Sequence, residues 1–164
     1  MNYRAIIDKY YPEDNVLKHI LLTHSQSVAQ RALQVVSLHP ELALDRQFVM
    51  EAAMLHDIGI YRCHAPGIEC YGTEDYIQHG RIGADILRAE GFPRHARVCE
   101  RHTGAGLPGF LPETLEEKLV CYADKFYSKT RLDNEKTIDE AERSLAKFGN
   151  DGVERFREWV KLFE

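Results

Sequence analysis

AAMLHDIGIY, residues 52–61, is an apolar stretch with a histidine and an aspartate side by side at its centre. Val49, Ala52, Ala53 and His56 align on one face of a helix predicted over residues 45–57, for which Asp45 is a suitable N-cap and Gly59 a suitable end. His56 therefore falls on the face that the apolar residues assign to the core, and Asp57 adjoins it. Such a pair needs a chemical explanation, because an unpaired buried charge costs several kcal/mol.

Helical periodicity dominates the remaining sequence as well. An apolar stripe predicts a helix over 13–38, and further helices are expected at about 77–91, 93–102, 112–129, 135–148 and 152–163. Residues 61–75 read as a long loop, and TGAGLPGFLP, residues 103–112, reads as a glycine-rich one. No segment resembles a strand pair. The sequence thus predicts an all-α helical bundle, with residues 1–164 forming a single domain.

Composition limits the function and the location. At 164 residues with 44% hydrophobic content, the chain is long enough for one sizeable core. The net charge is −5 and like charges form no long run, so we expect no long nucleic acid as partner. Four cysteines without CxxC spacing, and an N-terminus unlike a secretory signal, lead us to expect a cytoplasmic protein. No stretch is apolar enough for a membrane helix.

Several polar residues occupy positions that their own helices assign to the core. Because six inward-pointing groups from five helices must neutralise one another or share a cation, they predict a buried metal centre. A mixed set of imidazoles and carboxylates suits a divalent Fe, Mn, Co, Ni or Zn ion. His19, His39, His64 and His95 are interpreted as solvated. The predicted ligands are His24, His56, Asp57, His79, His102 and Asp124.

Adjacent residues on a helix point about 100 degrees apart, so His56 and Asp57 cannot face the same way within one. At the end of a helix just before Gly59, however, the backbone is expected to loosen enough for both side chains to reach one centre. The doublet is then a pair of metal ligands, and the apolar run is its scaffold.

The order of these motifs resembles the HD-domain metal-dependent phosphohydrolase superfamily, which is helical throughout. The resemblance runs from His24 through LHDIG, QHGRIGADIL and ERHTGAG to YADKFYSK, and so covers residues 24–124. It implies that His24, His56, Asp57 and Asp124 bind one metal. It also implies that His79 and His102 complete a second site in which Asp57 bridges both ions.

The resemblance further implies hydrolysis of a phosphate ester or anhydride of a small nucleotide-like substrate by a metal-activated water, with Asp57 at the centre of the reaction. Small bacterial hydrolases of the superfamily are the most similar group. Cyclic-dinucleotide cleavage is disfavoured, because Arg101 precedes His102 and the Gly-Tyr-Pro signature is missing. Lys125 and Arg81 are nominated as phosphate contacts. Loop 61–75 is a candidate lid, with Tyr71 or Tyr76 as a base-stacking residue.

Two other functions stay open. Some superfamily members use the same four histidines and two aspartates on two iron ions as oxygenases. A regulatory or interaction domain that keeps its metal but has lost turnover is the third hypothesis, although a binding module has little reason to bury six costly polar groups. A homodimer is compatible with the sequence but cannot be read from it.

Overall fold

The computed structural model describes residues 1–164, and helices dominate it. Its α-helices and short strands are α1 (Tyr3–Tyr10), α2 (Val16–Leu38), α3 (Arg46–Leu55), β1 (His64–Ala65), β2 (Cys70–Tyr71), α4 (His79–Ala89), α5 (Pro93–Arg101), α6 (Leu115–Asp124), β3 (Tyr127–Ser128), β4 (Arg131–Glu135), α7 (Ile138–Ala146) and α8 (Asn150–Phe163). Single 3₁₀ turns are η1 (Pro40–Leu42), η2 (Ile60–Arg62), η3 (Pro66–Ile68) and η4 (Tyr76–Gln78). The predicted all-α class is confirmed.

Side-chain caps set where the site-bearing helices begin. The Asn15 side chain accepts a hydrogen bond from the Lys18 amide at the start of α2, and Asp45 accepts one from the Phe48 amide at the start of α3, as predicted. Thr114 and Glu117 form a capping box at the start of α6. These bonds satisfy amides that the first helical turn leaves unpaired, and they fix the register of each apolar face.

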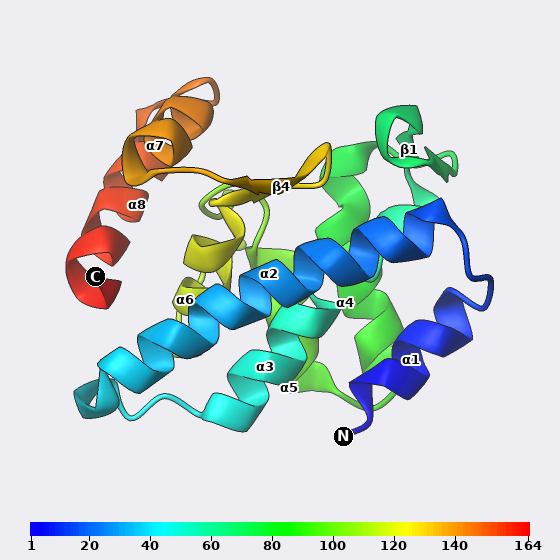
Figure 1. Cartoon of the computed structure of the whole chain (residues 1–164), viewed down its shortest axis with the longest axis horizontal. Helices are drawn as coiled ribbons and strands as arrows, with labels where there is room; N and C mark the ends of the chain where they lie inside the picture. Colours follow the sequence, from blue (N-terminus) through cyan, green and yellow to red (C-terminus); the bar gives the residue numbers. More distant parts are fainter.

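The long helix α2 crosses the whole molecule and organises the packing (Figure 1). It packs against α3 and α6, while α5 lies against α3, α4 and α6. Leu21, Val28, Val49 and Leu119 are fully buried between these helices. The final two helices, α7 and α8, pack against each other, and we call them the C-terminal hairpin (residues 138–163). Phe156 of α8 packs against the ring of Tyr122 of α6. The core therefore has helices on all sides.

Two expectations about local structure were wrong, and one helix was not predicted. Two short antiparallel hairpins exist, β1 with β2 and β3 with β4, and the first lies inside the region expected to be an irregular loop. Helix α1 was not predicted; Ile6 and Ile7 are buried, and Tyr11 just beyond it donates a hydrogen bond to the carbonyl of Ile58. The helix expected over 112–129 ends at Asp124 and gives way to the second hairpin.

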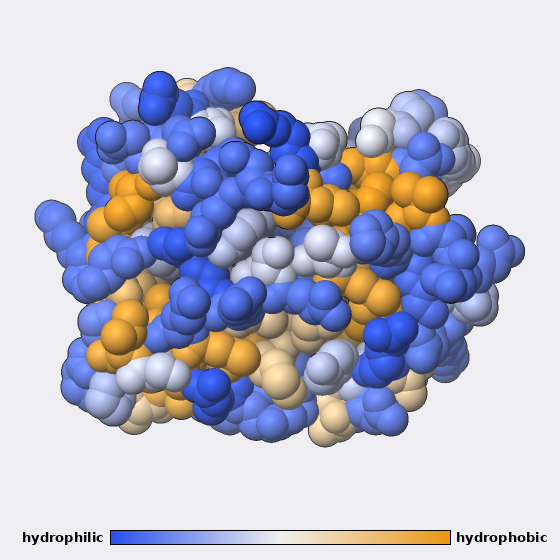
Figure 2. Space-filling model, in the orientation of Figure 1, coloured by the Kyte–Doolittle hydropathy of each residue, from blue (hydrophilic) through white to orange (hydrophobic).

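The surface in this view is mostly hydrophilic, and its apolar residues lie in small separate groups (Figure 2). None of the helices combines the length and the apolar character that crossing a membrane requires.

Candidate metal centre

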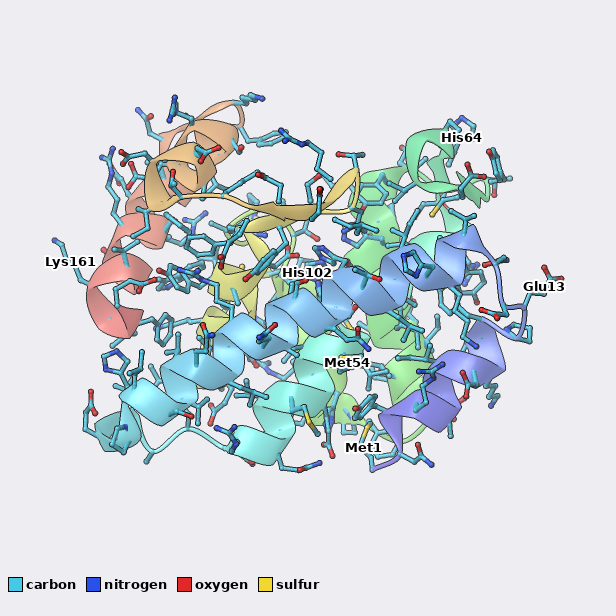
Figure 3. The ribbon with its side chains drawn as sticks, viewed as in Figure 1. Met1, Glu13, Met54, His64, His102 and Lys161 are labelled. Atoms are coloured by element: carbon cyan, nitrogen blue, oxygen red, sulfur yellow. The ribbon has the colours of Figure 1, made fainter.

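Five segments bring the six predicted ligands together. His24 lies in the middle of α2, His79 is the first residue of α4, His102 follows α5, and Asp124 is the last residue of α6. The fifth segment, the turn after α3, carries His56 and Asp57. Four of the five segments thus present their ligands near a helix end, where the backbone direction is easily adjusted. His102 is buried, and Figure 3 shows it near the centre of the view.

The His-Asp doublet sits in the turn that follows α3. The helix ends at Leu55, so His56 and Asp57 are both outside its regular part, and four turn residues carry the chain to Ile60. Both side chains are fully buried. Their shared direction follows from this early end, as the sequence led us to expect.

One group of ligands comprises His24, His56, Asp57 and Asp124, whose ligand atoms all lie within 4.8 Å of one another. The Nε2 atom of His24 is 2.9 Å from Oδ1 of Asp124 and 3.2 Å from Oδ2 of Asp57. The Nε2 atom of His56 is 3.3 Å and 3.2 Å from the same two oxygens. Two imidazoles and two carboxylates therefore converge on one point.

A second group joins Asp57 to His79 and His102. Here the other carboxylate oxygen of Asp57, Oδ1, is 3.3 Å from Nε2 of His79 and 3.1 Å from Nε2 of His102. Asp57 thus directs one oxygen toward each group.

Backbone carbonyls orient three of the four imidazoles. The Nδ1 atom of His56 lies 2.6 Å from the carbonyl oxygen of Ala53, that of His102 lies 2.7 Å from the carbonyl of Cys99, and that of His79 contacts the carbonyl of Tyr76. Each Nδ1 must carry a proton in order to donate, which leaves the Nε2 lone pair free as a ligand. The ring of Tyr76 also stacks on His79, with centroids 4.4 Å apart.

The donor set fits a transition-metal ion. Nε2 of His79 and Nε2 of His102 face each other at 2.9 Å although carbonyls hold both Nδ1 protons, so two lone pairs meet with no proton of their own to share. Oδ1 of Asp57 is buried and has no hydrogen-bond partner. Buried acceptors in this arrangement need a shared cation. Nitrogen with oxygen ligands suits Fe, Mn, Co, Ni or Zn.

Electrostatics keeps Asp57 and His102 in the forms that bind a metal ion, whereas it favours the protonated form of His56. Burial would raise the pKa of Asp57, but His56 and Lys129 hold that pKa well below its usual range. Burial lowers the pKa of His102 to about 4, so this imidazole is neutral at pH 7. Burial would also lower the pKa of His56, yet the charge of Asp57 and a hydrogen bond with Asp124 raise it to about 10. The two carboxylates therefore favour protonation of His56, and a metal ion that binds its Nε2 must displace that proton.

Two lysines touch the ligand carboxylates. The ammonium of Lys125 donates to Oδ2 of Asp124 at 2.9 Å and to the carbonyl of His102 at 3.0 Å. Lys129, which sequence reasoning did not single out, donates to Oδ2 of Asp57 at 2.7 Å. Its position depends on the turn between β3 and β4, which follows the early end of α6. The available signal was a second lysine in YADKFYSK, residues 122–129.

Arg81 lies outside the cluster. Its guanidinium bonds to Gln78 and Asp85, and its side chain is 53% exposed. It is two residues from His79 on α4, a spacing that places it on a different face of the helix. The structure thus places Arg81 in a surface network and not with the six predicted ligands, and its role as a phosphate contact stays a prediction.

The remaining histidines stand apart from the centre. His19 and His64 are exposed as predicted, and Figure 3 shows His64 at the edge of the molecule. His95 was interpreted as solvated, but its side chain is only 11% exposed and its Nε2 lies 2.9 Å from a carboxylate oxygen of the buried Glu51. His39 also has a carboxylate partner, Glu41. All four cysteines are free and buried.

A cavity of about 750 Å³ opens beside the second ligand group. His79, His102, Asp124 and Lys129 form its metal-centre side. Tyr76 lines it, whereas Tyr71 is exposed and donates to Glu69. Loop 103–112 and the C-terminal hairpin supply much of the remaining wall, which includes Thr103, Gly104, Gly106, Leu107, Pro108, Leu111, Leu145, Phe148 and Arg155.

Comparison with known proteins agrees with this geometry. The family model described as HD domain matches residues 21–128, a segment that contains all six ligands. The chain belongs to the HD domain family. The matched segment begins within α2 and ends at Ser128 of β3, just before Lys129. The C-terminal hairpin (residues 138–163) therefore lies outside it.

Relatives of the HD domain protein have names of two kinds. An uncharacterised protein of Methanocaldococcus jannaschii is 33% identical over 81% of this chain and 84% of its own length. A tRNA (cytidine(56)-2'-O)-methyltransferase of Picrophilus torridus is 30% identical over 84% of this chain, and one of Thermoplasma volcanium is 32% identical over 73%. This chain spans only 42% and 35% of those two methyltransferases. No solved structure matches the chain.

Proposed function

We propose that this HD domain is a metal-dependent phosphohydrolase that cleaves a phosphate ester or anhydride of a small nucleotide-like substrate. The observation that carries the proposal is Asp57, a buried carboxylate whose two oxygens face two groups of histidine ligands while Lys129 holds it from outside. Divalent ions held by these ligands would neutralise phosphoryl charge and lower the pKa of a nucleophilic water.

The chain's own residues have distinct tasks in this reaction. Asp57 and Asp124 fix the spacing of the two ligand groups, and Lys125 holds Asp124 in place from behind. Lys129 uses one of its three N–H donors on Asp57, so two are left for oxygens of a phosphoryl group. It lines the 750 Å³ cavity and is thus at the boundary between ligands and substrate.

The same cavity supports a nucleotide-like substrate. Its volume is in the range of small-molecule sites, and most of the surface that lines it is apolar. The side chains of Tyr76 and Phe148 offer flat surfaces on which a base can stack. We therefore propose that the phosphate of the substrate lies at the metal centre and that its nucleoside lies against the remaining walls of the cavity.

The names of the two methyltransferase relatives do not lead us to propose methyl transfer by this chain. They describe proteins of which the chain spans less than half, and the six buried ligands of the HD domain match phosphate chemistry better than methyl transfer. Because those relatives are named for acting on tRNA, nucleotides with 3'-phosphates and 2',3'-cyclic phosphates belong in a substrate screen.

The test combines metal analysis with a phosphate-release screen. Protein purified without chelators is analysed for metals and assayed with Mn²⁺, Fe²⁺ or Co²⁺ on nucleotides, dinucleoside polyphosphates and sugar phosphates. Cyclic and other diesters are followed by chromatography of the nucleoside product. Asp57→Ala is the inactive variant, and His64→Ala is the matched control because His64 is exposed and distant from the centre.

We expect turnover in the wild type and in His64→Ala, and loss of bound metal and turnover in Asp57→Ala. An Asp57→Ala protein with full metal and full activity would overturn the proposal. Bound iron with oxygen uptake and no substrate hydrolysis would favour the oxygenase, and bound metal with neither activity would favour the regulatory module.

A further inference from the structure

A second cavity, of about 530 Å³, lies next to the one already described. The two have several lining residues in common, among them Tyr76, Asp124, Lys129 and Phe148. Both therefore border the metal centre, and the C-terminal hairpin lines both. The polar residues that line the second cavity are Tyr76, Asp124, Lys125, Tyr127, Ser128, Lys129, Thr130, Lys136 and Ser144.

The second cavity has an excess of positively charged lining residues, whereas in the first cavity the charges of Lys129 and Arg155 are matched by two aspartates. Three lysines line it, and the only acidic residue among its lining residues, Asp124, is already bonded to Lys125. Lys129 is paired with Asp57, which lies behind it in the core. An excess of positive charge thus faces this cavity.

Lys136 differs from the other two lysines because its ammonium has no carboxylate partner within ion-pair distance and donates no hydrogen bond. Its backbone amide donates to the carbonyl of Phe126, which anchors the residue just after β4. The side chain is half-buried. Burial lowers the pKa of Lys136 against the pull of Asp124, and the charges of Lys125 and Lys147 act in the same direction as burial.

The unused donors in this cavity match an anion with several acceptor oxygens. Lys136 keeps three N–H donors, Lys129 keeps two, and Lys125 keeps one. Ser144 makes no side-chain hydrogen bond and adds a hydroxyl. A phosphate group presents enough oxygens to accept from several of these donors at once, which a carboxylate does less well.

We propose that Lys136 forms a subsite for a second phosphate group, so that the preferred substrate is a nucleotide with at least two phosphates and not a monophosphate. The inference rests on the proposed function, because it places the first phosphate at the metal centre. The nucleoside then lies in the apolar cavity and the second phosphate in the basic one. Lys136 is a specificity-determining residue in this scheme and does not take part in bond cleavage.

The experiment compares AMP with ADP in the Mn²⁺-loaded protein. Hydrolysis consumes one water in each case and gives adenosine plus phosphate from AMP, or AMP plus phosphate from ADP. The variant is Lys136→Gln. Its control is Lys147→Gln, which removes the same charge from an exposed lysine that acts on Lys136 but lines neither cavity.

We expect Lys136→Gln to raise KM for ADP about tenfold, the loss typical of one charge-assisted contact, with kcat and the kinetics on AMP unchanged. Lys147→Gln should change KM for ADP less than about twofold, since an exposed charge is screened. Equal KM effects of the two variants, or no preference of the wild type for ADP, would overturn the inference.

A binding measurement separates this inference from the proposed function. By calorimetry the wild type should bind α,β-methylene-ADP about tenfold more tightly than AMP, and Lys136→Gln should bind the two alike. If no nucleotide is hydrolysed but this difference is found, the subsite stands and the phosphohydrolase proposal fails. If AMP is hydrolysed and the difference is missing, the subsite is wrong and the proposed function stands.

Discussion

Replacing Gly59 by alanine tests how the fold holds the centre together. A Cβ atom at this position would lie 2.3 Å from the carbonyl oxygen of His79 and 2.6 Å from the amide nitrogen of Gly83. Both are backbone atoms of α4, so no side chain can rotate away to make room. Since ordinary contacts are longer than about 3.4 Å, the turn after Asp57 and helix α4 must separate by about 1 Å.

The magnitude follows from this separation. Overpacking of a core costs about 1–3 kcal/mol, and a clash with rigid backbone belongs at the upper end, so we expect Gly59→Ala to lower the free energy of unfolding by about 3 kcal/mol. For a chain of this size that is a fall in Tm of about 6–12 °C. Because α4 carries His79, the same movement would draw its Nε2 away from Asp57 and weaken the second ligand group.

Two measurements check this prediction: urea unfolding of the metal-free protein and metal content per chain. Gly67→Ala is the control, because a Cβ there meets no atom within 4 Å and its backbone does not require glycine. It should unfold within about 0.5 kcal/mol of the wild type. A Gly59→Ala protein with wild-type stability and metal content would refute the packing argument.

Three further outcomes follow from the site. His79→Ala should lower the metal content by about one ion per chain in elemental analysis, because the first ligand group does not include it. Lys129→Met should lower kcat/KM for phosphate release about tenfold or more through the lost charge-assisted contacts, while the exposed control Lys161→Met should not. Phe148→Ala should raise KM for nucleotides several-fold and leave unfolding within about 0.5 kcal/mol of the wild type, since the ring is 88% exposed but lines both cavities.

Most of the helices and the convergence of the six polar residues could be predicted from the sequence because both follow from local periodicity. His24 and Asp124 stand at positions of an apolar stripe, and polar residues at such positions indicate a shared site once several helices are considered together. The structure brings all six of these residues into two groups. No single histidine would have justified the inference, because isolated buried histidines are common.

Lys129 and Arg81 show where the same reasoning stops. The periodicity predicted that the helix carrying Asp124 continues to residue 129. In the structure the helix ends at Asp124, and the turn between β3 and β4 brings Lys129 into contact with Asp57. Arg81 is close to His79 in sequence but lies on another face of α4. Short hairpins and the exact end of a helix depend on tertiary contacts, which a sequence pattern does not contain.

The division of the chain into two parts makes the chemistry and the choice of substrate separable. All six ligands and both Lys125 and Lys129 lie within or at the edge of the matched segment, residues 21–128. Lys136 lies beyond this segment, as does the C-terminal hairpin, from which Leu145 and Phe148 line both cavities. Substitutions in the hairpin should therefore change KM and substrate preference with metal content unchanged, whereas substitutions in the ligands should change metal content first. A variant in the C-terminal hairpin that lost its metal would show that the two parts are coupled. The C-terminal hairpin would then stabilise the metal centre as well as line the substrate site.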